Sequence, residues 1–330
     1  MTTDIRRRLL LGGLALPAVL PRSAPAQAFP ARPVTWVVPF AAGGVTDVPA
    51  RLIAQKMTAQ LGQPVVVENR PGAGGTIGTE QVSRAPPDGY TLLYGTYNTL
   101  AVAPLLFPNL RYDPERDFVP VWGIGAAANL LVCSPALPVR GVAGLVAHAK
   151  ARPDRVTYAS SGIGSGQHLA AELFQQVAGV RMAHVPYAGS QQALNDLSAG
   201  RVDVMFDYAL SALPHAREGR MRALAVTATE RLAVAPEVPT IGEAGLPGAE
   251  MTGWAGVYAP ARTPQPVVER LAGAVAAAMR DPAVVEMFDR TGTILWADKS
   301  AGDMRRALAE EIPRARELMS RSAATGGRAN

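Results

Sequence analysis

The stretch VTWVVPFAAGGVTDVPARLIAQKMTAQL (residues 34–61) contains, in order, an extended apolar run, a loop of small residues and an amphipathic segment. A second stretch, VTYASSGIGSGQHLAAELFQQV (residues 156–177), repeats this order. β-Branched and aromatic residues favour a strand in the first part, and apolar residues at helical spacing favour a helix in the last. The two stretches therefore predict two copies of a strand–loop–helix unit.

Each loop predicts a site for an anion. Small residues at the start of a helix leave backbone N–H groups exposed at the positive end of the helix dipole. Gly44 and Gly164 lie about 120 residues apart, which is the length of a typical domain. The repeat therefore indicates two lobes whose loops face one small anionic ligand. The alternative is that both loops are ordinary strand-to-helix turns, which most α/β proteins contain.

The first 28 residues have the order of an export signal. Three arginines (Arg6–Arg8) precede an apolar run of twelve residues, Leu9–Leu20, and the triplet Ala26–Ala28 places the cleavage after Ala28. A helix of this length spans about 18 Å, which is too short for a bilayer. The arginines resemble a twin-arginine signal, but Ile5 stands where Ser or Thr is usual, so both export routes stay open. We expect the mature protein in the periplasm.

Charge and cysteine content exclude several classes of partner. Four arginines and one aspartate belong to the signal, and the remaining chain is nearly neutral. It has no cluster of Lys and Arg that would bind nucleic acid or an anionic membrane. The single cysteine, Cys133, cannot form an internal disulfide, and its apolar neighbours predict a buried thiol.

The alternation of strand-like and helical segments predicts an α/β fold with two lobes, each a mainly parallel sheet flanked by helices. The expected strands are Val34–Val38, Val65–Glu68, Thr91–Tyr94, Leu130–Cys133, Val156–Ala159, Val202–Phe206 and Ala223–Val226. The expected helices between them include Asp47–Leu61, Gly74–Arg84, Gly166–Ala178 and Ser190–Ala199.

The chain is expected to cross between the lobes twice and to form a hinge there. Val121–Cys133 is apolar and rich in small residues, as an interdomain strand would be, and Met251–Ala259 is the second candidate. Beyond Pro264 the pattern is helical to Met319, and we assign these helices to the first lobe. The predicted first lobe is therefore 29–127 with 250–330, and the second is 128–249.

Eight motifs follow one another over the whole mature chain. They are PFAAGGVTDVPARLIAQ (39–55), VVVENRPGAGGTIG (65–78), PPDGYTLLYGT (86–96), VTYASSGIGSGQHLAAELF (156–174), HVPYAGS (184–190), GRVDVMFD (200–207), MRALAVT (221–227) and PEVPTIGEAGLPG (236–248). In this order they resemble the Bug-type periplasmic solute receptors of tripartite tricarboxylate transporters. Two positions depart from the family pattern: Val45, where Pro, Ser or Gly is usual, and Ala188, where many members have Lys or Arg.

The resemblance implies a type II periplasmic binding protein fold and a receptor that is not an enzyme. Such a receptor captures a small carboxylated metabolite between its lobes and delivers it to the membrane permease subunits of the transporter. We expect a monomer with no cofactor and no metal. The missing charge at Ala188 implies a ligand class different from that of lysine-bearing members.

The expected site lies beyond the carboxyl ends of the strands, where ligands of open α/β sheets bind. Backbone amides and hydroxyl groups from both loops would donate to the carboxylate. The predicted ligand-binding residues are Phe40, Gly43, Gly44, Val45, Thr46, Asp47, Thr96, Asn98, Ser160, Ser161, Gly162, Ser165, Gly166 and Asp207.

Three of these residues have an alternative structural role. Thr46 and Asp47 are typical helix N-cap residues, and Asp47 would otherwise meet an ammonium or hydroxyl group of the ligand. Asp207, at the end of a strand, would either stabilise a turn or hydrogen-bond a ligand group or a bound water.

Catalytic alternatives have little support in the sequence. The four histidines lack metal-ligand spacing, and no Gly-x-Ser-x-Gly motif occurs. Ser160 or Ser161 as the nucleophile of a hydrolase would need a histidine and an acid that the sequence does not locate. A periplasmic sensor module, which would report its ligand to a signalling partner in place of a permease, has the same site chemistry and stays open.

Overall fold

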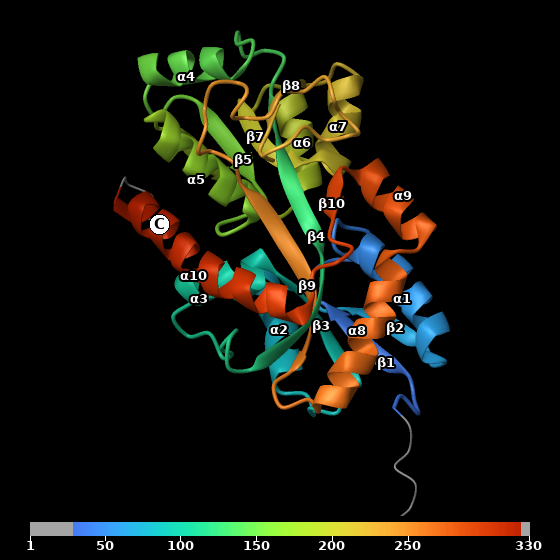
Figure 1. Cartoon of the computed structure of the whole chain (residues 1–330). Coiled ribbons are helices and arrows are strands. Elements are labelled where there is room, and N and C mark those ends of the chain that lie inside the picture. The colour runs from blue at the N-terminus through green and yellow to red at the C-terminus, as the bar shows by residue number, and fades with distance from the viewer. Residues whose placement is uncertain (1–28, 325–330) are drawn as a thin grey trace, which may run out of the picture.

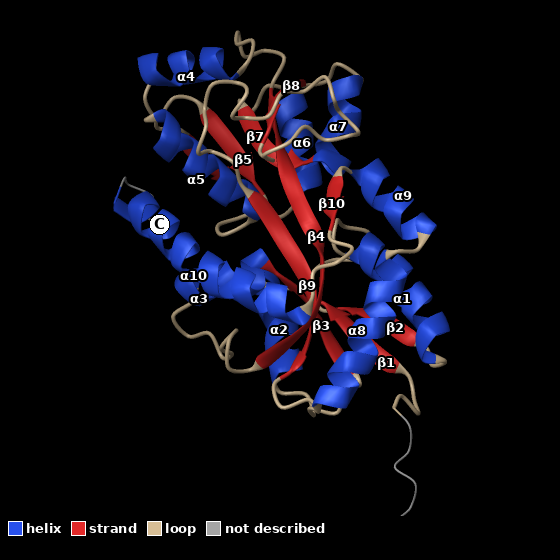
Figure 2. Ribbon diagram, in the orientation of Figure 1, coloured by secondary structure: helices blue, strands red, loops and turns tan. Residues whose placement is uncertain are grey.

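A computed structural model describes residues 29–324, and the expected export signal over residues 1–28 lies outside them. The strands are β1 (Val34–Val38), β2 (Val65–Asn69), β3 (Thr91–Thr96), β4 (Phe118–Cys133), β5 (Thr157–Ser160), β6 (Ala183–Pro186), β7 (Val204–Tyr208), β8 (Arg222–Val226), β9 (Thr252–Pro260) and β10 (Thr293–Leu295). The helices are α1 (Asp47–Leu61), α2 (Thr76–Ser83), α3 (Ala103–Leu106), α4 (Val142–Ala151), α5 (Gly166–Ala178), α6 (Ser190–Ser198), α7 (Ala209–Arg217), α8 (Gln265–Met279), α9 (Pro282–Thr291) and α10 (Ala301–Ala324), with two short segments, η1 (Ala73–Gly75) and η2 (Asn98–Val102). Helices flank the strands in both halves of the molecule (Figures 1 and 2).

The strands form one continuous sheet in the order β2-β1-β3-β9-β4-β7-β5-β6, and β8 and β10 pair with β4. The pairs β1–β2, β1–β3, β5–β6 and β5–β7 are parallel, as expected for each lobe. Every antiparallel pair contains β4 or β9. The predicted α/β fold is confirmed, and every antiparallel pair described involves one of the two strands that contain the segments expected to cross between the lobes.

Strands β4 and β9 run side by side through the middle of the molecule (Figure 1). Ala126 pairs with Trp254 and Ala128 with Thr252, so the two segments expected to cross between lobes are neighbours. β4 has 16 residues, and its first part pairs with β9 while its last part pairs with β7 and β8. One strand therefore belongs to the sheets of both halves.

The C-terminal segment is helical beyond Pro264, with a new helix that begins at Pro282 after the N-cap Asp281, but it also contains a strand that the helical pattern did not predict. Helix α9 ends at Gly292, which has the left-handed φ of 67°, and β10 then pairs with Gly125–Ala127 of β4. A three-residue strand is too short to interrupt a helical pattern visibly. Helix α8 packs on α1, α9 contacts both α1 and α7, and α10 contacts η2 and α5. The C-terminal helices therefore touch elements of both halves.

Buried apolar side chains fill each half of the molecule. Trp36 of β1 and Ile53 of α1 are fully buried beside α8, and Leu130 and Met205 are fully buried beside α6 and α7. Cys133 is buried in β4, which confirms the predicted environment of its thiol. Among the helices described, none is long and apolar enough to cross a membrane.

Candidate functional site

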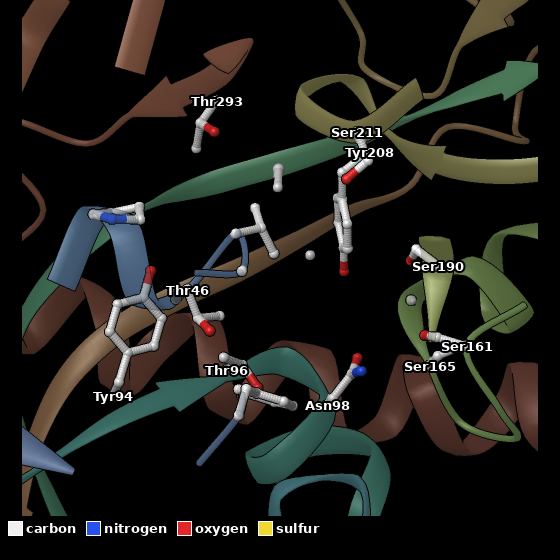
Figure 3. A pocket seen from close by; sticks show the side chains of 18 of the residues that line it. Thr46, Tyr94, Thr96, Asn98, Ser161, Ser165, Ser190, Tyr208, Ser211 and Thr293 are labelled. Carbon is white, nitrogen blue, oxygen red and sulfur yellow. The ribbon is translucent and has the colours of Figure 1, made fainter. Parts of the chain in front are cut away.

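A cavity of about 550 Å³ lies where the carboxyl ends of β1, β3 and β5 meet the middle of β4 and the start of β9. The loops before α1, α5 and α6 form its walls together with residues of β4, β9 and β10. Figure 3 shows Ser161, Ser165 and Ser190 on one side of the pocket and Thr46 on another. The phenol of Tyr208 points into the space between them (Figure 3).

The structure places most of the predicted site residues of the first half on the pocket wall. They are Phe40, Gly43, Gly44, Val45, Thr46, Thr96 and Asn98. Gly43 has a φ of 78°, which a residue with a side chain rarely adopts. Its N–H donates to the Asp47 carboxylate over 2.7 Å, so this amide does not face the cavity as we expected. The loop is therefore held in shape by the residue that follows it.

Asp47 does not line the cavity, and its side chain is only 3% exposed. Its carboxylate accepts hydrogen bonds from the Gly43 N–H, Arg51 Nε at 3.0 Å and Asn69 Nδ2 at 2.8 Å. Burial alone would raise the pKa of Asp47, but these hydrogen bonds, Arg51 first, bring it below its ordinary value. The structure contradicts the expected capping by these side chains. Thr46 occupies the N-cap position of α1, but its side chain makes no capping hydrogen bond. The carboxylate of Asp47 accepts from the preceding loop at Gly43 and so does not cap the helix either.

In the second half, Ser161, Ser165 and Gly166 line the cavity, and Ser160 and Gly162 do not. Ser165 is the N-cap of α5, and its hydroxyl accepts the N–H of His168. Ser160 is fully buried, and its hydroxyl lies 2.7 Å from His184 Nε2. Neighbouring residues of an extended chain point to opposite faces, so Ser160 points behind the wall that Ser161 forms.

A pair of histidines supports this loop from behind. His184 stacks on Tyr158 with a centroid distance of 4.7 Å, and His168 lies 4.6 Å from His184. Burial and then the charge of His168 lower the pKa of His184 to about 4, so this ring is neutral at physiological pH. Within the described residues, no group of three His, Cys, Asp or Glu side chains could hold a metal ion.

Asp207 also lies behind the wall, fully buried at the end of β7. Its Oδ1 accepts from Gln167 Nε2 at 2.6 Å and from the Ser190 hydroxyl at 3.2 Å. Gln167 Oε1 in turn accepts from the N–H and the hydroxyl of Ser161. Gln167 and Ser190 line the cavity. Asp207 therefore does not reach the cavity but orients two residues that do.

Several wall residues lie outside the list of predicted ligand-binding residues. Ser190 opens α6 directly after β6 and so repeats the strand–loop–helix order, which could have revealed it. Tyr94, Tyr97, Trp254 and Phe288 give the cavity an aromatic side, with the rings of Tyr97 and Trp254 6.2 Å apart. Tyr97 follows the end of a strand, where ligand contacts are expected, whereas Trp254 and Phe288 join it on the cavity wall only when β3, β9 and α9 pack.

The cavity wall, as far as the structure describes it, contains no Asp, Glu, Lys, Arg or His side chain. Its polar groups are backbone amides, serine and threonine hydroxyls, three phenols and the amides of Asn98, Gln167 and Gln191. Val45 is on the wall and Ala188 is not. Such a site binds through oriented dipoles next to aromatic surface, which suits a small anion with an organic body.

This two-lobed α/β fold with a polar cavity between the loops is that of a type II periplasmic binding protein, a class of solute receptors. The chain belongs to the tripartite tricarboxylate transporter family of receptors, whose sequence pattern matches residues 49–323. This family consists of solute-binding receptors and not of enzymes. The predicted family is therefore confirmed.

Three known proteins illustrate the similarity. The chain is 43% identical over 311 residues to the "UPF0065 protein in tcbD-tcbE intergenic region" of Pseudomonas sp. (strain P51), covering 93% of this chain and 90% of the relative. It resembles the structure of periplasmic binding protein BugD, with 35% identity, a TM-score of 0.80 and coverage of 89% and 99%. It also resembles R. palustris Rpa4515 with adipate, with 39% identity, a TM-score of 0.82 and coverage of 89% and 98%.

Proposed function

We propose that this protein is a periplasmic receptor that captures a small carboxylate in the cavity and delivers it to the permease of a tripartite tricarboxylate-type transporter. The observation that carries the proposal is a wall of hydroxyl and amide donors without a charged side chain among its described residues, at the start of α5 and α6. The similar structure of R. palustris Rpa4515 with adipate supports a carboxylate as the ligand class. We further propose that the ligand-binding residues are the predicted ones that line this cavity.

Neutral donors suffice for useful affinity. A hydrogen bond to a charged group contributes about 1.5–3 kcal/mol, and a helix N-terminus adds about 0.3–2 kcal/mol. Four such donors reach the roughly 8 kcal/mol that correspond to a micromolar dissociation constant, after the loss of ligand freedom is subtracted. The absence of an anionic group on the described wall also disfavours ligands that carry an ammonium group.

We propose that residues 29–127 and the segment after residue 250 form the first lobe and that residues 128–249 form the second. The paired stretches of β4 and β9 around Ala126 and Trp254 would then be the hinge. The cavity lies beside this hinge and takes wall residues from loops on both sides of it. Closure of the lobes would bury the ligand and present a new surface to the permease.

The test is a thermal-shift screen of residues 29–330 with adipate, malate, succinate and benzoate, followed by calorimetry. A ligand that binds only the folded state raises the melting temperature. The matched control is adipamide, which keeps the chain of adipate without its charges and should give no shift. The proposal fails if no carboxylate binds, or if adipamide binds as well as adipate. Capture of solubilised membrane proteins on the immobilised receptor distinguishes a permease from a signalling partner.

A further inference from the structure

Asp207 is an unusual residue to find behind an anion-binding wall. It is fully buried at the end of β7, and its Oδ2 has no hydrogen-bond partner. No lysine, arginine or histidine in the described part of the chain forms an ion pair with it. A buried carboxylate without a cation is expensive to ionise. Burial raises the pKa of Asp207 to about 6, although the side chain of Gln167, the backbone N–H of Tyr208 and the hydroxyl of Ser190 work in the opposite direction.

The ionised carboxylate determines where the wall donors point. Gln167 Nε2 donates to Asp207 Oδ1 and to Ser190 Oγ, each over 2.6 Å. The hydroxyl hydrogen of Ser190 points to Asp207, and the N–H and hydroxyl of Ser161 point to Gln167. The donors of these three wall residues are therefore turned away from the cavity, where an anionic ligand would need them.

The other titratable groups around β7 are engaged elsewhere. On β5 and α5, Tyr158 donates to Glu172, and His168 lies beside the Gly164 N–H. On α6, Asp196 pairs with Arg201 and Tyr187. On α7, burial and then the charge of Arg220 lower the pKa of His215, and Glu218 acts in the opposite direction. Burial and then the charge of Asp207 raise the pKa of the adjacent Tyr208 to about 12, which keeps this phenol neutral.

We propose that binding of a carboxylate in the cavity is coupled to the uptake of one proton by Asp207. This inference rests on the proposed function, because it requires an anion at the wall. A ligand carboxylate brings a second negative charge next to the hydrogen-bonded group of Asp207, Gln167 and Ser190. Two carboxylates that share one hydrogen-bonded group do not both stay ionised, and the buried one, which has no cation, takes the proton from water.

Protonation also supplies the ligand with a donor. The new O–H of Asp207 donates to Ser190 Oγ across the contact that is now 3.2 Å long. Ser190 then accepts from Asp207 and Gln167, and its own hydroxyl hydrogen is free to point into the cavity. Protonation of the buried Asp207 thus allows the Ser190 hydroxyl to donate a hydrogen bond to the ligand, and no charged side chain enters the cavity.

The sign of the pH dependence follows from this linkage. The free protein binds the proton below about pH 6, and the complex binds it at higher pH as well. Carboxylate affinity is therefore highest below pH 6 and falls by up to about tenfold for each pH unit above it, until the pKa of the complex is reached.

The experiment is calorimetry of adipate, with malate in parallel, at pH 7 in two buffers of different ionisation enthalpy. The difference in apparent enthalpy gives the protons taken up, and we expect a value close to one. Asp207→Asn should bind adipate with no proton uptake and no pH dependence, because Asn can donate to Ser190 as the protonated acid does. His184→Gln is the matched control for the histidine pair and should retain the uptake.

A second measurement follows the carboxyl group of Asp207 directly. The carboxyl carbon of Asp207, labelled with ¹³C and assigned by its loss in Asp207→Asn, should titrate near pH 6 in the free protein and at higher pH with adipate. A free-protein midpoint near 4 overturns the coupling. Binding without proton uptake, or equal uptake in Asp207→Asn, overturns the coupling and leaves the proposed function intact. If the protein binds neither adipate, malate nor any other carboxylate of the screen, both the proton coupling and the proposed function are wrong.

Discussion

Ser165 serves the fold and the cavity with different atoms. Its hydroxyl oxygen accepts the His168 N–H and so caps α5, and the residue also lines the cavity. Removal of this side chain would therefore mix a loss of stability with a loss of binding. A variant that keeps the cap and changes only the charge separates the two roles.

We expect Ser165→Asp to keep the stability of the protein and to weaken carboxylate binding by more than about tenfold, which is ~1.4 kcal/mol. Asp caps a helix as well as Ser does and suits the positive end of the dipole, but its charge repels an anionic ligand. Ser165→Asn is the control, because it caps equally well and is neutral. Thermal melts and calorimetry check both variants. Equal binding by the two would place the ligand away from the start of α5.

Asp47→Asn tests the residue that shapes the first loop. We expect a loss of about 1–3 kcal/mol in the free energy of unfolding at pH 7, because hydrogen bonds from Gly43, Arg51 and Asn69 lose their charged acceptor. The pKa of Asp47 is lowered by folding, so its contribution is complete above the unfolded value of about 3.9 and disappears as the pH falls through the folded value.

Urea denaturation from pH 7 to pH 3 measures this contribution. The difference between wild type and Asp47→Asn should be constant down to about pH 4 and shrink below it. A difference that is the same at pH 3 and pH 7 would contradict the role of the ionised carboxylate. Binding of an amino-bearing carboxylate should change no more than binding of adipate, because Asp47 does not reach the cavity.

The limit of sequence-based prediction at this scale is the direction of each side chain. The positions of Thr46, Ser161 and Ser165 after their strands were enough to predict residues that the structure places on the wall. Asp207 was expected in the site, yet the next residue, Tyr208, takes the wall position because successive strand residues face opposite sides. The burial of a side chain behind the wall depends on the packing of neighbouring elements, which one sequence does not show.

At the scale of elements, local signals predicted boundaries well. Strand β1 and helix α5 have the predicted bounds, since Pro39 follows the first and Ser165 and Gly179 flank the second. Strand β4 begins earlier than the expected crossing segment, at Phe118, and β10 was missed inside a helical pattern. Both errors concern strands whose partners are distant in the chain, so local propensity says little about them.

Because β10 packs on β4 at Gly125, we expect a substitution of this glycine to destabilise the protein. A methyl group there would press against the carbonyl oxygen of Ile294 and lie 2.9 Å from the ring of Phe288. We expect Gly125→Ala to lower the free energy of unfolding by about 1–3 kcal/mol, as overpacking does, and to weaken adipate binding because Phe288 and Thr293 line the cavity.

Gly253→Ala is the matched control for this variant. Gly253 lies on β9 opposite Ala127 and also lines the cavity, but a methyl group there would meet nothing within 4 Å. We expect its stability, measured by urea denaturation, to stay close to that of wild type. An equal loss in both variants would show that any side chain at this part of the wall is harmful, whether or not β10 is displaced.

At the scale of the whole molecule, the cavity sits beside β4, which pairs with strands of both halves, and beside its neighbour β9. If the lobes move about these strands, adipate at saturation should reduce the radius of gyration in small-angle scattering. A methyl group at Gly253 would meet no neighbour, so Gly253→Ala should contract like wild type. An unchanged radius with proven binding would contradict closure and leave binding unaffected.

The pairing of β9 with β3 also has a consequence for the order in which the chain folds. Strand β3 pairs with β9, which closes a loop of roughly 160 residues, and the entropy of closing so long a loop must be overcome before the pair is stable. Folds dominated by such distant contacts acquire their structure slowly. The segment of residues 128–249 has its own β5–β6–β7 contacts and can assemble first, whereas the N-terminal strands wait for the C-terminal quarter of the polypeptide. A nascent chain truncated before Thr252 should therefore expose the edge of β3 and bind chaperones.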